Sequence, residues 1–174
     1  MKIIEALKNL QIIQKRIDKN CQQIREYCSY LNVEVPAFET PERQKQEVDS
    51  LIQANLDLEK EYLRLKLAIE HTNLITKVTI GGFVYTISEL VSIRRIVGKF
   101  RTNTYASLDP SVSVRRLQLH LSSKANVDPS NPPKVINLSK EEYKNIHLRE
   151  WENFIAQIDG TLEVVNATVE LSNY

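Results

Sequence analysis

Apolar residues recur at alternating spacings of three and four along three long stretches of the chain. In the first stretch this a/d pattern predicts one long helix that packs against a neighbour. The seam consists of Ile3, Leu7, Leu10, Gln14, Ile17, Cys21, Ile24, Cys28 and Leu31. Proline disfavours helical backbone in the residue before it, so we expect this helix to end near residues 33–36.

A second helix is predicted to start after Thr40, because threonine is a good N-cap and Pro41 suits the first helical position. Its seam consists of Val48, Leu51, Asn55, Leu58, Tyr62, Leu65 and Ile69. Two long helices joined by a short turn predict an antiparallel hairpin. The polar Asn55 either fixes register or oligomer state, or points to the edge of the interface.

The second predicted helix also carries apolar residues outside its seam. This second strip consists of Ile52, Leu56, Leu63 and Leu67. One antiparallel partner covers one face of a helix, so the strip needs a further partner. We therefore expect the chain to form a homo-oligomer.

Two glycines, Gly81 and Gly82, stand between the short β-forming segments KVTI and FVYT. This arrangement is typical of a two-residue β-hairpin turn, so residues 77–86 are predicted to form a hairpin. Thr86 and Glu89 then form a capping box that opens another helix.

The sequence of residues 115–121 alternates leucine with polar residues, and KVINL follows after a proline-rich loop. The alternation predicts a second hairpin near residues 115–138. Ser139 and Glu142 form a capping box for a last helix. Its seam consists of Leu148, Trp151, Ile155, Ile158, Leu162, Val165 and Val169. Gly160 lies inside this helix and suggests a close approach to another helix.

Together these patterns predict a mainly α fold, a long antiparallel bundle of about four helices with one or two small β-hairpins. We expect one helical-bundle domain over residues 1–174, with hairpin insertions near 77–86 and 115–138. The composition, 42% apolar and 26% charged, is typical of soluble proteins. Apolar runs fall short of the ~20 residues of a membrane span, and the N-terminus lacks the features of a signal peptide. These observations predict a cytoplasmic protein without a membrane partner.

The residues that carry most metal and catalytic chemistry are few and scattered. His71, His120 and His147 fall on different predicted elements, and no phosphate-binding loop is present. Cys21 and Cys28 lie about 10.5 Å apart along a helix, which is too far for a disulfide, and we expect both to be buried in the seam. The sequence therefore predicts no metal, no cofactor and no catalytic residue, and enzymatic activity is not expected.

Basic residues gather between positions 94 and 124, where seven stand against one acid. They are Arg94, Arg95, Lys99, Arg101, Arg115, Arg116 and Lys124. Such a stretch can bind nucleic acid through phosphate contacts. The alternative, which we favour, is that these residues pair with the glutamates of the long helices, because no aromatic base-stacking platform accompanies them.

Small polar groups stand near two predicted helix ends. One contains Asn73 and Thr76, and the other contains Asn166 and Thr168. These side chains either satisfy the free backbone groups at the helix ends or share a ligand pocket with Arg94 and Arg95. The second alternative predicts a small-molecule-binding protein or enzyme.

Several short motifs resemble a family of small bacterial helical-bundle proteins sometimes labelled septicolysin. They are MKIIEAL, QKRI, the Thr-Asn pair after Ile69, the glycine turn, ISEL and NATVEL. The family's usual aromatic residue after the C-terminal asparagine is replaced here by Ala167. The resemblance spans nearly the whole chain and implies a self-assembling protein with an accessory role, carried on mobile genetic elements, in a family without an established activity.

Overall fold

The computed structural model describes residues 1–122 and 131–172 and is mainly α, as predicted. The chain divides into two compact units. The first unit contains Met1–Ser88 and Leu162–Tyr174, and the second contains Glu89–Thr161. The single domain over residues 1–174 stays a prediction.

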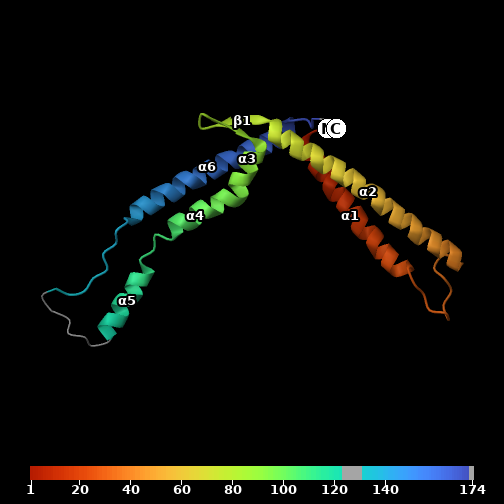
Figure 1. Ribbon diagram of the computed structural model, residues 1–174, viewed down its shortest axis with the longest axis horizontal. Helices are drawn as coiled ribbons and strands as arrows, with labels where there is room; N and C mark the ends of the chain where they lie inside the picture. Colours follow the sequence, from red (N-terminus) through yellow and green to blue (C-terminus); the bar gives the residue numbers. More distant parts are fainter. Residues whose placement is uncertain (123–130, 173–174) are drawn as a thin grey trace. The chain divides into compact units, whose positions relative to one another are not determined.

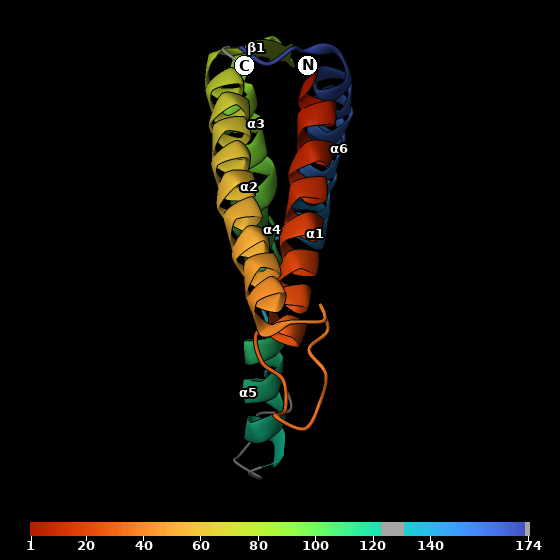
Figure 2. The same ribbon diagram turned by 90° about the vertical axis from the view of Figure 1, so that its right-hand side faces the viewer.

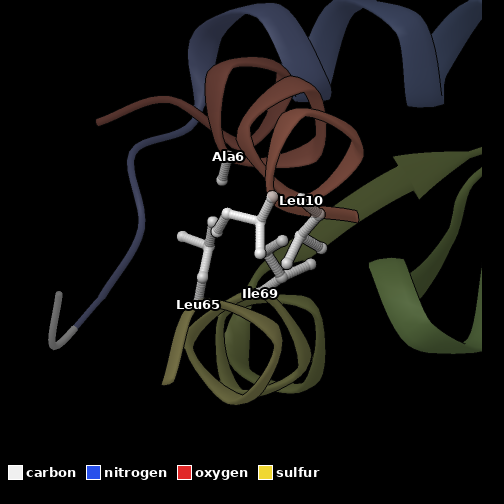
Figure 3. Close-up of a cluster of buried hydrophobic side chains, with 5 residues drawn as sticks. Ala6, Leu10, Leu65 and Ile69 are labelled. Atoms are coloured by element: carbon white, nitrogen blue, oxygen red, sulfur yellow. The ribbon is translucent and has the colours of Figure 1, made fainter. Parts of the chain in front are cut away.

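The first unit is built on an antiparallel helical hairpin. Helices α1 (Ile3–Tyr27) and α2 (Pro41–Ile75) lie side by side along most of their length (Figures 1 and 2). Their common core consists of Ala6, Leu10, Ile13, Leu65 and Ile69, four of which are labelled in Figure 3. The seam predicted for α2 is confirmed, since its residues are buried or half-buried.

Three positions of the α1 seam are each shifted by one residue from the prediction. Ala6, Ile13 and Asn20 take the places expected for Leu7, Gln14 and Cys21. The shift keeps the amide of Gln14 in water and buries the apolar Ile13 instead. The prediction that Cys21 and Cys28 are buried is therefore wrong, because both cysteines are exposed.

Helix α1 also ends earlier than predicted, at Tyr27. The connection to α2 is held by Gln44, whose Oε1 accepts a hydrogen bond from the Ala37 N–H at 2.9 Å. Its Nε2 donates to the Tyr27 carbonyl at 2.7 Å, so one buried side chain joins the end of α1 to the loop. The predicted N-cap of α2 is confirmed, since Thr40 Oγ1 accepts a hydrogen bond from the Arg43 N–H.

The predicted first hairpin is also confirmed. Strands β1 (Lys77–Ile80) and β2 (Phe83–Thr86) pair antiparallel. Gly81 and Gly82 have φ values of 58° and 84°, which identify a two-residue primed turn. Near the hairpin, the C-terminal segment closes the first unit: the Ser172 N–H donates to the buried Thr72 Oγ1 at 3.0 Å, and the Leu171 N–H to the Met1 carbonyl at 2.9 Å.

The second unit consists mainly of two helical stretches. The first runs through α3 (Ile87–Ser92), whose first two residues belong to the first unit, and then through the π-helix η1 (Ile93–Val97) and α4 (Gly98–Ala106). Helix α4 lies alongside α6 (Glu141–Thr168), whose residues from Leu162 onward belong to the first unit (Figure 1). The predicted seam of α6 is confirmed, because its residues are buried or half-buried.

The glycine at the close helix approach is Gly98 and not Gly160. A Cβ atom at Gly98 would lie 3.6 Å from Ile155 Cδ1 and 3.7 Å from Trp151 Cζ2, both on α6. Around Gly160 there is open space, so the suggestion of a close approach there is wrong.

The second predicted hairpin, near residues 115–138, is also wrong. Residues 115–121 belong to helix α5 (Ser111–Ser122), and KVINL forms no strand. Leu117 and Leu121 take part in the alternation but also, together with Val114, have helical spacing, and leucine and arginine favour helices. Residues 123–130 of the predicted loop lie outside the described residues.

Candidate interaction surfaces

A line of leucine and isoleucine side chains runs along the solvent side of α2 in the first unit. The residues of this α2 strip are Ile52, Leu56, Leu63, Leu67 and Leu74, and each is 44–60% exposed. At 3.6 residues per turn they fall within about 60° of arc. Their centre line lies about 120° away from the seam that faces α1. The structure thus confirms that α1 leaves the strip predicted from the sequence uncovered, and adds Leu74 to it.

Charged residues accompany the α2 strip. Glu59 and Lys66 lie on the same side of its centre line, about 50–70° from it. Lys66 Nζ lies 3.4 Å from Glu70 Oε1, one helical turn further on. This ion pair is half-exposed, so it leaves the Lys66 side chain within reach of a second acidic partner.

Asn55 lies between the two helices of the hairpin and is 8% exposed. Its Oδ1 accepts a hydrogen bond from Asn20 Nδ2 at 2.9 Å, and its Nδ2 donates to Cys21 Sγ at 3.5 Å. Because the interacting groups belong to α1, the side chain can specify the register of the hairpin within one chain. A role in the oligomer state stays a prediction.

The second unit contains a groove of about 600 Å³ between α6 and the stretch from Arg94 to Asn103. Its apolar wall contains Gly98, Trp151, Ile155 and Ala156. The π-helix η1 directly precedes Gly98, and π-helical turns are often found at functional sites. The sequence patterns did not predict this groove, because it depends on which faces of two distant helices meet.

Arg94 marks one end of the groove. Its Nε lies 2.5 Å from Asp159 Oδ1 on α6. The contact is an ion pair, and Asp159 Oδ1 is buried. The pairing of Arg94 with an acid was one of the two alternatives for the basic stretch.

The other basic residues vary in their surroundings. The guanidinium carbon of Arg101 lies 4.2 Å above the centre of the Trp151 ring, a cation–π contact. Lys99 lines the groove, while Arg95 is exposed. Lys124 lies outside the described residues. Two of the predicted phosphate ligands thus already contact α6.

All four small polar residues lie in the first unit. Asn73 is half-buried, and its buried Oδ1 has no hydrogen-bond partner within the described ranges. Thr76 lies at the end of α2, where its carbonyl accepts a hydrogen bond from the Ile87 N–H at 3.1 Å. Asn166 is half-buried, and Thr168 Oγ1 donates to the Val164 carbonyl at 2.8 Å. The Thr168 hydroxyl thus contacts a backbone carbonyl near a helix end, whereas the Thr76 contact involves its backbone alone. Both alternatives for these residues, including a pocket shared with Arg94 and Arg95, stay predictions.

His147 belongs to an aromatic cluster of the second unit. Its ring stacks on Tyr105 at 5.2 Å and meets the edge of Tyr143 at 4.4 Å. Its Nδ1 lies 3.1 Å from Glu150 Oε2. Over residues 1–122 and 131–172, no group of three potential ligands is placed to hold a metal ion.

Nowhere in the described ranges does a helix combine the length and the apolar character needed to cross a membrane.

Comparison with known proteins identifies a similar fold but indicates no activity. No protein-family model matches the chain, and no curated protein is significantly similar to it. A functionally unknown conserved protein from Corynebacterium diphtheriae has a similar crystal structure, with a TM-score of 0.53. The match covers 99% of both chains at 19% sequence identity. At this identity the likeness shows that the two chains share a fold and carries nothing further.

Proposed function

We propose that this chain is a non-enzymatic protein that works by associating with further copies of itself through its helices. The observation that carries the proposal is the exposure of the α2 strip on the side of the hairpin that α1 does not cover. Apolar residues scattered singly over a surface are ordinary, but an aligned row of five is typical of a binding surface.

The energetics favour an apolar partner for this surface. Complete burial of one leucine or isoleucine side chain is worth about 1.5–3 kcal/mol. The side chains of the α2 strip are already about half-buried, so each contributes a part of this value, and the row together offers several kcal/mol. Costs of association take up much of that gain, so we expect weak self-association that depends on protein concentration.

The resemblance to the septicolysin-labelled family supports the same proposal, because it implies self-assembly and an accessory role. The nucleic-acid alternative has less support. Arg94 is already paired with Asp159, so a phosphate would have to compete with this carboxylate.

Sedimentation equilibrium of the wild-type protein over a range from about 1 to 100 μM tests the proposal. We expect the average mass to rise from 20.1 kDa toward a multiple of it as the concentration increases. An average mass that stays at 20.1 kDa throughout the range would contradict self-association.

A second candidate function is small-molecule binding in the groove of the second unit. It is favoured by the volume of about 600 Å³ and by the apolar wall around Trp151, since ligand pockets are mostly apolar with a few polar groups. Trp151 is the single tryptophan of the chain, so its fluorescence reports on the groove directly.

The probe for this second function is anilinonaphthalene sulfonate, an aromatic anion. We expect it to quench Trp151 with a saturable dependence on concentration. Replacing Ala156 by phenylalanine fills the groove and should weaken the quenching, whereas unchanged quenching in this variant would place the probe elsewhere.

A further inference from the structure

We propose that the α2 strip binds the α2 helix of a second copy in antiparallel orientation, across a twofold axis that passes beside Leu63. This inference rests on the proposed self-association and specifies its partner surface and register. It follows from the spacing of the strip and from the charges on its flank.

The spacing of the strip fits this register. Ile52 and Leu74 stand eleven residues on either side of Leu63. With Leu63 opposite its own copy, Ile52 lies opposite Leu74 of the second copy at both ends of the contact. Leu56 and Leu67 fall level with Glu70 and Glu59 of the second copy, between the apolar residues of the facing row, so the two apolar rows interdigitate.

The flanking charges fit it as well. A twofold axis perpendicular to two antiparallel helices brings the same flank of each helix together. Glu59 then comes within one residue, about 1.5 Å along the axis, of the level of Lys66 of the second copy. The symmetry repeats this pair, so the interface contains two ion pairs between opposite charges. Both side chains are at the rim of the strip, where they favour correct register more than they add affinity.

Two other registers bring a charged residue close to its own copy. A twofold axis between Glu59 and Lys60 would set Leu56 opposite Leu63, but it would also bring Glu59 within one residue of the level of its own copy. A parallel pair would place each residue beside itself, including Glu70, which lies about 30° from the centre line of the strip. Like charges at such positions oppose pairing, and parallel helices also align their dipoles unfavourably.

A single cysteine at position 63 tests the register. Cys21 and Cys28 are first replaced by serine, and Leu63→Cys or Leu56→Cys is then introduced. In the proposed dimer the two copies of position 63 face each other, within reach of a disulfide. The two copies of position 56 lie fourteen residues apart along the axis, about 21 Å, which no disulfide can span. Mild oxidation should therefore link the Leu63→Cys variant and leave the Leu56→Cys variant unlinked.

Disulfide formation at positions 63 and 56, together with sedimentation of the wild-type protein, distinguishes a wrong register from a failure of self-association. A disulfide at position 56 would overturn the antiparallel register. If wild-type protein sediments as a dimer and neither variant forms a disulfide, the register is wrong although self-association stands. If wild-type protein is a monomer, both proposals fail.

A charge exchange supplies an independent test. Glu59→Lys and Lys66→Glu each create two like-charge contacts in the proposed dimer, so each should raise the dissociation constant severalfold at low salt. The double variant restores opposite charges and should return the dissociation constant to near the wild-type value. Circular dichroism checks that Lys66→Glu, which also loses the pair with Glu70, keeps the helix. If the double variant instead shows the sum of the two single losses in dimer affinity, the proposed pairing is wrong.

Discussion

Asn20 and Asn55 face each other across the helical hairpin, and the 2.9 Å hydrogen bond between their side chains crosses an otherwise apolar seam. Replacing Asn55 by alanine leaves the Asn20 amide without this acceptor, in a part-buried position. We expect a loss of about 1–3 kcal/mol in the free energy of unfolding, measured by urea denaturation.

A double-mutant cycle with Asn20→Ala separates the hydrogen bond from the packing. The sum of the two single-variant losses in the free energy of unfolding should exceed the double-variant loss by at least about 0.5 kcal/mol. This is because each single variant removes the same hydrogen bond. Strictly additive losses would show that the two side chains act independently.

Gln44 is a second buried polar residue with a defined structural role. At 4% exposure it bridges the Ala37 N–H and the Tyr27 carbonyl. Gln44→Ala should lower the free energy of unfolding by about 1–3 kcal/mol, because both backbone groups lose their partner. The matched control is Gln46→Ala on the same helix, where the side chain is exposed and the change should stay within about 0.5 kcal/mol. Equal effects at both positions would contradict the bridging role.

The turn of the β-hairpin depends on backbone conformation alone. A side chain at Gly81 or Gly82 would meet no other part of the chain within 4 Å of its Cβ atom, yet both residues have positive φ. Valine at either position should therefore cost about 1–3 kcal/mol through strain. We expect faster amide exchange in residues 77–86, with helical circular dichroism near the wild-type level.

Gly160→Ala is the control for this experiment. Gly160 lies within α6 and has open space around it, so alanine should raise stability by up to about 1 kcal/mol. If valine at Gly81 and Gly82 left amide exchange unchanged, the positive φ values would not be required for the hairpin.

Local signals were sufficient to predict several elements. Thr40 and Pro41 mark the start of α2, and Gly81 and Gly82 mark the turn, because each signal depends on the conformational preferences of one or two residues. Three positions of the α1 seam were predicted one residue too far along the chain. Leu7 and Ala6 are both apolar, and only the contact with α2 decides which of them is buried.

Features that depend on distant residues were harder to predict. The ion pair between Arg94 and Asp159 joins residues 65 positions apart, and nothing near either residue indicates the other. The same holds for the groove beside Trp151. Helix α5 was mistaken for a strand because an alternating pattern of leucines can also contain the helical spacing from Leu117 to Leu121. The α2 strip, in contrast, was recognisable because it lies on one regular helix.

The central claim is that the α2 strip holds two copies together, and a matched pair of leucine substitutions tests it most directly. Leu63 lies in the strip at 58% exposure, and Leu31 lies in the connection between α1 and α2 at 62% exposure. Leu63→Glu should raise the dimer dissociation constant at least about tenfold in sedimentation equilibrium, since about 1.4 kcal/mol of lost burial already has that effect. Leu31→Glu should associate like the wild-type protein. If Leu63→Glu also associates like the wild type, the strip is not the interface and the account is wrong.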